Sequence, residues 1–256
     1  MRPLLFLLAL TACAKRVQDT TVDEVEVTTV RRAFANVHWV EAGELTLLVD
    51  TGIEAEADAL VEQLRALGKD PAELDLIIAT HGHDDHAGGA ATLRRASGAP
   101  VLLGAGDLPL ASAGRNDAGP LCATDRIGRS RLEGVQEASY APLEPTMRLE
   151  PGATSNLNQL LQQDGPPAAV YAIPGHTEGS LVVTVGNAVF VGDMFRGAIG
   201  VGGARVHFYQ CDLTDNRADI ERVLGELAPG GERFYTGHFG PLGRKDVERL
   251  VERMAD

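Results

Sequence analysis

The segment Ala79-Thr-His-Gly-His-Asp-Asp-His-Ala-Gly-Gly89 places three of the chain's seven histidines and two aspartates within six consecutive positions. A solvated polar turn is the simplest explanation, but random placement would give H-x-H-x-D-H in only about one chain in a thousand. Imidazole and carboxylate groups at this spacing are ligands that a borderline divalent ion such as zinc prefers. In a turn after a strand, His81 and His83 would aim at one point. Asp85 and His86 would aim at a neighbouring point, so the motif predicts two metal ions.

Apolar periodicity around this motif predicts alternating strands and helices. Residues 74–79 form a buried-strand pattern that runs directly into the motif, and residues 88–97 continue with helical spacing up to Gly98. This order favours an α/β fold in which helices cover mixed sheets. The same patterns predict strands over 44–50, 168–173, 181–185 and 188–191, and helices over 57–67, 215–227 and 245–254.

Further ligand-type residues stand just after other short apolar stretches. His176 follows the predicted strand over 168–173, Asp193 follows the one over 188–191, and His238 follows the apolar residues at 234–236. Each of these residues lies in a turn that contains glycine, which lets backbones crowd around an ion. The two metals predicted by the histidine motif therefore have candidate ligands from three other parts of the chain.

Taken together, these motifs resemble those of the metallo-β-lactamase-fold hydrolases. The resemblance runs from about residue 30 to residue 242. It implies a single-domain αββα sandwich, in which two mixed β-sheets are covered by helices. It is specific for the fold and the metal site but not for the substrate, because this superfamily attacks many kinds of bond. The matching motifs are Asp50-Thr-Gly52, His81-Gly-His-Asp-Asp-His86, Pro174-Gly-His-Thr177, Gly192-Asp193 and Gly237-His238.

The resemblance also implies a role for each of these residues. Two zinc ions are the expected cofactors, with iron, manganese or a mixed pair as alternatives. Asp193 would bridge both ions, and Asp50 matches the aspartate that orients a ligand histidine and fixes its tautomer. The first ion would be held by His81, His83 and His176, and the second by Asp85, His86 and His238.

Hydrolysis of a small-molecule ester, lactone, thioester or related carbonyl substrate is the reaction that such a site predicts. Two divalent ions hold one hydroxide between them because they lower the pKa of water from 15.7 toward about 7. Asp85 is the candidate catalytic residue that orients this hydroxide and moves its proton, since it would bind one metal and keep a second oxygen free.

Other activities are weighed against this one. A β-lactamase is disfavoured, because those branches of the superfamily generally lack the bridging aspartate. Glyoxalase II enzymes and lactonases are closer, but only 18 residues follow His238, too few for a glutathione-binding domain, and Arg196 stands where lactonases often have tyrosine. The formal charge of −13 disfavours a nuclease or any nucleic-acid partner. The intact ligand set disfavours a non-catalytic binding protein.

An iron-dependent dioxygenase that acts on a persulfide-like thiol is the main alternative from another reaction class. Such an enzyme would use mainly His81 and His83 together with Asp193 or His176. The complete second set of ligands favours the dinuclear hydrolase instead, and the metal content of the protein would discriminate between the two.

Two segments are candidates for substrate recognition. The glycine-rich stretch after Asp193 carries Arg196, Arg205, His207 and Tyr209, and an arginine there would suit an anionic substrate group. The alternative is that these arginines pair with some of the 36 acidic residues. Residues 104–146 lack clear periodicity and are expected to form an insertion or lid. His38 and Tyr235 are expected in the core or next to the ligands.

The N-terminus has the pattern of an export signal. Residues 1–12 combine an arginine with a short apolar run, which is typical of a signal peptide. Leu10-Thr-Ala-Cys13 resembles a bacterial lipobox, which implies lipidation at Cys13 and a lipid-anchored protein of the cell envelope, although an ordinary signal peptide fits too. An acidic spacer over 13–29 would precede the folded domain, 30–256. Outside the cytoplasm, Cys122 and Cys211 form either a disulfide or two separate thiols.

Overall fold

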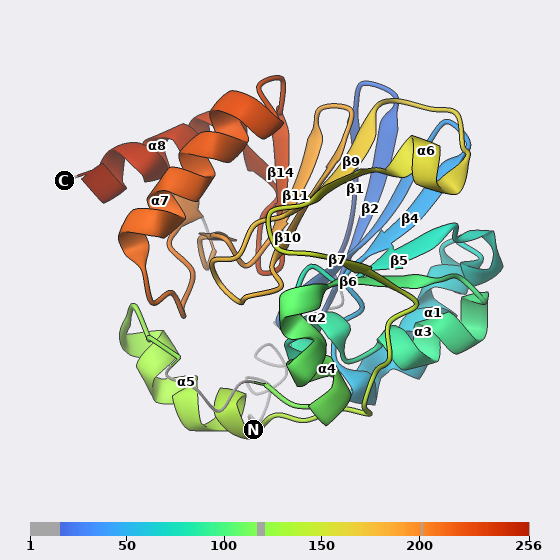
Figure 1. The fold of residues 1–256 in the computed structure, drawn as a ribbon, viewed down its shortest axis with the longest axis horizontal. Coiled ribbons are helices and arrows are strands. Elements are labelled where there is room, and N and C mark those ends of the chain that lie inside the picture. The colour runs from blue at the N-terminus through green and yellow to red at the C-terminus, as the bar shows by residue number, and fades with distance from the viewer. Residues whose placement is uncertain (1–15, 117–120, 201, 256) are drawn as a thin grey trace, which may run out of the picture.

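The structure is a computed structural model that describes residues 16–116, 121–200 and 202–255 (Figure 1). The predicted signal peptide over residues 1–12 and the lipidation site Cys13 lie outside the described residues and stay predictions. Within the described ranges, no helix is both long enough and apolar enough to span a membrane. Two mixed β-sheets pack face to face, with helices on both outer faces, which confirms the expected αββα sandwich.

The first sheet has seven strands, arranged in the order in which they occur along the chain. The first four strands form an antiparallel meander, and the fourth to seventh strands pair in parallel. The strands are β1 (Arg16–Val22), β2 (Val25–Arg32), β3 (Ala35–Ala42), β4 (Leu45–Val49), β5 (Leu76–Ile78), β6 (Val101–Gly104) and β7 (Met147–Leu149).

The expected spacer over 13–29 is wrong for residues 16–29, because they form β1 and part of β2. β1 pairs with β2 along its whole length, beginning with Arg16 opposite Arg31. Val25 and Val27 are fully buried in the core between the sheets. β1 lies at the edge of the sheet and has mostly exposed polar residues, so it lacks the apolar run that marks a buried strand. The folded domain therefore begins before residue 30.

The second sheet has six strands in the order β15-β14-β11-β10-β9-β8. Three of the strands predicted from the sequence correspond to β9, β10 and β11, and β11 pairs in parallel with β14. A separate two-stranded ribbon, β12 and β13, follows β11. The bounds are β8 (Thr154–Asn156), β9 (Ala168–Ala172), β10 (Leu181–Val185), β11 (Ala188–Gly192), β12 (Arg196–Gly197), β13 (Ala204–Arg205), β14 (Arg233–Thr236) and β15 (Leu242–Gly243).

Helices cover the outer face of each sheet (Figure 1). α1 and α3 pack on the first sheet through Leu60 and Leu93, and α7 and α8 pack on the second through Ile220 and Leu250. A π-helical turn, Val223–Leu227, continues α7. The helices are α1 (Ala57–Ala66), α2 (Asp84–Ala87), α3 (Ala90–Ser97), α4 (Leu108–Ala113), α5 (Arg126–Glu137), α6 (Leu157–Leu161), α7 (Leu213–Arg222) and α8 (Arg244–Ala255).

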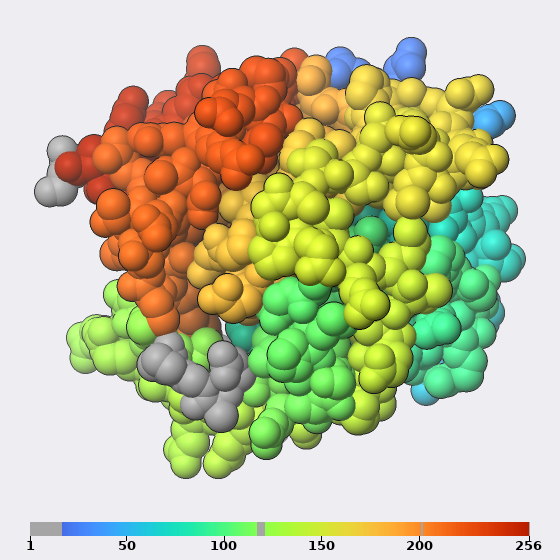
Figure 2. All heavy atoms as spheres, viewed as in Figure 1, coloured from blue at the N-terminus to red at the C-terminus, as the bar shows by residue number. Residues whose placement is uncertain are grey.

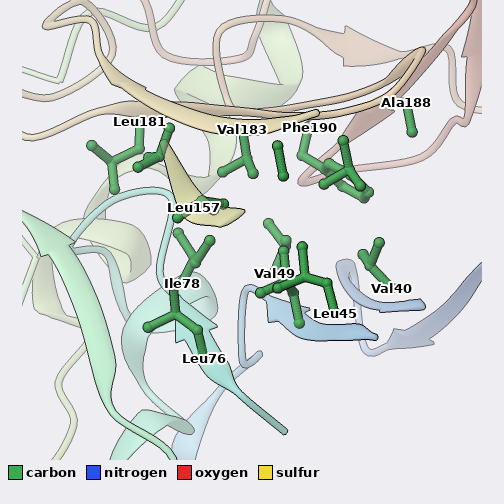
Figure 3. Close-up of a cluster of buried hydrophobic side chains, with 14 of the residues drawn as sticks. Val40, Leu45, Val49, Leu76, Ile78, Leu157, Leu181, Val183, Ala188 and Phe190 are labelled. Carbon is green, nitrogen blue, oxygen red and sulfur yellow. The ribbon is translucent and has the colours of Figure 1, made fainter. Parts of the chain in front are cut away.

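The main core lies between the two sheets (Figure 3). Val49 and Ile78 of the first sheet point toward Val183 and Phe190 of the second, and all four are fully buried. Side chains alternate across a strand, so Leu48 faces the opposite way and joins the core under α1 and α3. Each such apolar side chain contributes about 1.5–3 kcal/mol when it is buried. The sandwich thus holds its strand ends, where the candidate ligands lie, in fixed positions.

The segment between β6 and β7 carries α4 and α5 and corresponds to the expected insertion near residues 104–146. Its continuation beyond α5, in yellow-green, lies on the surface beside the green α4 (Figure 2). Cys122 and Cys211 form a disulfide, a point that the sequence leaves open. Thr124 N also donates to Phe208 O at 2.8 Å. The segment is therefore tied to the loop that follows β13.

We expect His38 to make the fold sensitive to acid. Burial lowers the pKa of His38 to about 4, and its ring contacts Thr29 Oγ1 at 2.9 Å and Thr236 O at 3.3 Å. The unfolded chain takes up this proton near pH 6.5, so stability is lost as the pH falls from there toward 4. The loss is about 2 kcal/mol between pH 7 and pH 5. Urea denaturation of His38→Gln should show a smaller acid loss than wild type, and equal losses would contradict this assignment.

Candidate metal centre

The histidine motif forms the turn between β5 and α2, at one edge of the sandwich. His83 occupies the N-cap position of α2, and Asp85 and His86 lie within this short helix. Leu181 N of the second sheet donates to Thr80 O at 2.7 Å, so this turn joins the two sheets. The other candidate ligands follow β9, β11 and β14 of the second sheet, at the same edge. The sandwich therefore brings all seven predicted ligands together.

Three histidines form a first group of ligand atoms. His83 Nδ1 lies 3.0 Å from His81 Nε2 and 3.2 Å from His176 Nε2. Burial lowers the pKa of His83 to about 4, and it lowers the pKa values of His81 and His176 well below the usual range. The three rings are therefore neutral at physiological pH. Converging lone pairs on neutral imidazoles are the donor set of a zinc-like ion.

Asp85, His86 and His238 form a second group beside the first. His238 Nε2 lies 3.2 Å from Asp85 Oδ2, and His86 Nε2 lies 3.7 Å from Asp85 Oδ1. Burial by itself would lower the pKa of His238, but Asp193 and Asp85 outweigh it and raise this pKa to about 10. The carboxylates thus create a negative field at this position. A divalent cation is the charge that such a field favours.

Asp193 lies between the two groups. Its Oδ2 atom is 3.2 Å from His238 Nε2 and 3.5 Å from His86 Nε2 on one side. On the other side it is 3.7 Å from His176 Nε2 and 3.9 Å from His81 Nε2. One carboxylate oxygen therefore faces donor atoms of both groups, which is the placement that the resemblance implied for a bridging ligand.

The ligand histidines are oriented through their opposite ring nitrogens. Asp50 Oδ2 lies 2.9 Å from His86 Nδ1, which is the contact that the resemblance implied. His176 Nδ1 donates to Tyr209 O and His238 Nδ1 donates to Phe34 O, both at 2.9 Å. Because these three acceptors hold Nδ1–H, the Nε2 atom of each ring is free to bind an ion.

Unpartnered buried atoms test whether the centre fits metal ions. His86 Nε2 and Asp193 Oδ1 are buried and have no hydrogen-bond partner among the described residues. Such atoms are costly unless something binds them. The donor set of nitrogen and carboxylate oxygen suits zinc, iron or manganese. The described residues therefore fit two divalent ions.

His207 also belongs to this centre. Its Nε2 atom lies 3.0 Å from Asp193 Oδ2, and its ring stacks on that of His238 at 5.4 Å. The sequence placed His207 among the substrate contacts, and the structure places it against Asp193.

A cavity of about 470 Å³ opens from the metal centre to the surface. His83, Asp85 and Asp193 lie among its lining residues, together with Tyr209. Part of α5 forms one wall, so the segment between β6 and β7 shapes the entrance. The volume is in the range of small-molecule sites.

The two arginines proposed as substrate contacts lie elsewhere. Arg196 is buried, pairs with Asp125 at 3.1 Å and lies over the Phe208 ring at 3.8 Å. Arg205 donates to the neighbouring Ala204 O at 2.9 Å. Neither arginine is among the described residues that line the cavity. The structure therefore agrees with the alternative interpretation for Arg196, in which it pairs with an acidic residue.

Asp107 supports the ligand turns, and its role was not predicted from the sequence. Asp107 Oδ2 accepts hydrogen bonds from Gly82 N and Thr177 Oγ1, both at 2.7 Å, and Oδ1 accepts one from Gly179 N at 2.8 Å. It thereby connects the turn of His81 and His83 to the turn of His176. The sequence does contain one signal for this role. Asp107 follows shortly after the apolar strand β6, just as the candidate ligands follow their own strands.

The fold and this centre define a class of metal-dependent hydrolases. The sequence profile of the Metallo-beta-lactamase superfamily matches residues 30–238. The chain belongs to the metallo-β-lactamase superfamily and is a metallo-hydrolase.

Several curated proteins are similar to this chain. The probable metallo-hydrolase YflN of Bacillus subtilis is 25% identical over 87% of this chain and 88% of its own length. A hydroxyacylglutathione hydrolase of Cupriavidus taiwanensis is 27% identical over 85% of this chain and 68% of its own length. Beta-lactamase-like protein 2 homolog of Drosophila melanogaster is 26% identical over 79% of this chain, but the match spans 58% of that protein.

Solved structures of metallo-β-lactamases share the fold. A Cronobacter sakazakii enzyme with the HARLDQ motif, mutant S60, has a TM-score of 0.65 and 20% identity over 95% of this chain and 94% of that one. The Rm3 metallo-β-lactamase has a TM-score of 0.61 and 21% identity over 91% of this chain and 90% of that one. At such identities the likeness concerns the fold alone.

Proposed function

We propose that this chain is a dinuclear hydrolase that cleaves an ester, lactone, thioester or related carbonyl bond of a small molecule. The observation that carries the proposal is the position of Asp193 Oδ2, within 3.9 Å of nitrogen atoms from both ligand groups. One ion would be held by His81, His83, His176 and Asp193, and the other by Asp85, His86, His238 and Asp193.

The chain's own residues have distinct tasks in this reaction. When bound, two divalent ions supply a nucleophilic water at neutral pH and polarise the carbonyl oxygen. Asp193 holds the two ligand groups at a fixed separation. Asp85 lines the cavity and is placed to orient the attacking water and to receive its proton. Apolar side chains, among them Phe208 and Phe239, line the cavity beside the ligands.

The second ligand group favours this hydrolase over an iron-dependent dioxygenase. A dioxygenase would use mainly the first ligand group with Asp193. In such an enzyme Asp85 and His238 would bind no metal ion. Their 3.2 Å approach and their shared contact with His86 support a second ion. Iron as the main bound metal, together with oxygen consumption, would favour the dioxygenase.

We expect hydrolysis to depend on bound metal and on His83. Purified protein would be screened against ester, lactone, thioester, β-lactam and phosphodiester substrates, with its metal content measured in parallel. A chelator should abolish turnover, and added zinc should restore it. His83→Ala should bind metal at least about 100-fold more weakly and lose turnover, because it removes one of three ligands from the first group.

His38→Gln is a matched control for this experiment, since His38 is a buried histidine that belongs to neither ligand group. It should keep the metal content of the wild-type protein. Turnover that survives the chelator, or a His83→Ala protein with full metal content and activity, would exclude the proposed reaction.

Asp85→Asn tests the role of this carboxylate in the reaction. The amide keeps an oxygen that can bind an ion but cannot receive a proton. We expect both metals to be retained and kcat to fall about 100-fold or more. Metal analysis and steady-state kinetics of the same preparation check this, and full turnover with both metals bound would remove Asp85 from the catalytic role.

A further inference from the structure

Exposed apolar side chains gather at the mouth of the cavity. Phe34, Ile127 and Ile199 are 52%, 46% and 54% exposed, and all three line this one cavity. They come from three separate places: the β2–β3 turn, α5, and the loop between β12 and β13. Such a cluster on a protein surface commonly marks a binding site for an apolar group.

This apolar rim is continuous with the metal centre. The Phe34 ring stacks on the ring of His238 at 5.8 Å, and Phe34 O accepts the hydrogen bond from His238 Nδ1. Phe208 and Phe239, whose ring centroids are 6.5 Å apart, extend the apolar surface inside the cavity. A chain attached to a carbonyl group at the metals would therefore lie along these side chains.

Apart from the metal ligands, the side chains that line the cavity provide little to bind an anionic group of the substrate. Arg131, which is exposed, is the one cationic side chain apart from histidine among the described residues that line it. Asp84 and Asp85 line the same cavity. Arg196, which the sequence offered as a partner for an anion, is paired with Asp125.

We infer that the substrate is a neutral carbonyl compound with an apolar chain next to the scissile bond, and that Phe34, Ile127 and Ile199 bind this chain. The inference rests on the proposed hydrolase function and narrows its substrate class. Burial of a methylene group contributes about 0.8 kcal/mol, so chain length should have a large effect on binding.

A series of p-nitrophenyl esters tests this inference with the metal-loaded full chain. Below the concentrations at which the esters form micelles, kcat/KM should rise at least about tenfold from acetate to octanoate. In Ile127→Ser and Ile199→Ser, the ratio of octanoate to acetate kcat/KM should fall at least about threefold. Leu160→Ser is the matched control, because Leu160 is a 38% exposed leucine on α6, outside the cavity. Its ratio should equal that of the wild-type protein.

Calorimetry separates this inference from the proposed function. N-methyloctanamide, whose acyl chain matches that of the octanoate ester, should bind at least about tenfold more tightly than N-methylacetamide, whether or not any ester is hydrolysed. Equal affinities, or equal kcat/KM values along the ester series, would overturn the inference and leave the hydrolase function standing. If none of the carbonyl substrates is hydrolysed but the amide with the eight-carbon chain still binds more tightly, only the hydrolase function is overturned. Binding of neutral phosphatidylcholine vesicles without chain-length selectivity would overturn the inference and assign the rim to a membrane surface.

Discussion

Asp193→Ala should reduce bound metal below two equivalents and lower kcat/KM by about 10³ or more. Asp193 Oδ2 faces donor atoms of both ligand groups, from His81 at 3.9 Å to His238 at 3.2 Å. Loss of this oxygen removes one ligand from each proposed ion. The expected drop corresponds to about 4 kcal/mol of transition-state stabilisation, which is the scale of metal-ion catalysis. Metal analysis and steady-state kinetics on one preparation measure both effects.

The control for this variant is Asp125→Ala. Asp125 is also an aspartate in an ion pair near the cavity, but it contacts Arg196 and caps α5 rather than facing the ligands. Asp125→Ala should retain two equivalents of metal. If Asp193→Ala also binds two equivalents and keeps its turnover, Asp193 is not a bridging ligand.

Gly237→Ala should damage the centre although it changes no ligand. A Cβ atom at this position would lie 2.3 Å from His86 Cε1 and 2.4 Å from Asp193 Oδ1. Both distances are far below van der Waals contact, so His86 and Asp193 would have to move. We expect metal affinity to fall about 100-fold and turnover to fall with it, as when a ligand loses its orientation. Zinc titration of the metal-free variant provides the affinity.

Gly225→Ala provides the matched control. Gly225 lies in the π-helical turn after α7, and a Cβ there would meet no atom within 4 Å. This substitution should leave metal affinity unchanged and be neutral or slightly stabilising. Equal metal affinities in Gly237→Ala and Gly225→Ala would mean that the centre tolerates the added methyl group, contrary to the packing described.

Much of the sandwich is predictable because its buried strands carry continuous apolar runs. The stretch over 181–185 coincides with β10, and the helix expected over 57–67 differs from α1 by one residue. β1 was missed because an edge strand with exposed polar residues lacks that signal. The helices α4 and α5 were missed because glycine and proline interrupt their segment.

The metal centre is predictable for a related reason. Its ligands belong to short motifs, and each motif stands at the end of an apolar stretch. The partners of these ligands have no such motif: Asp107 is a single aspartate, and Tyr209 acts on His176 through its backbone oxygen. The sequence left Arg196 open between a substrate contact and an acidic partner, because proximity to Asp193 does not reveal that Asp125, 71 residues away, is its partner.

Zinc titration of the metal-free protein tests the proposed dinuclear centre most directly. Zinc would be added in fractions of an equivalent, and hydrolysis of an ester identified in the screen would be measured at each step. The proposed function predicts that activity rises until two equivalents are bound, because both ligand groups are needed. Full activity at one equivalent, or no hydrolysis at any zinc content, would contradict it.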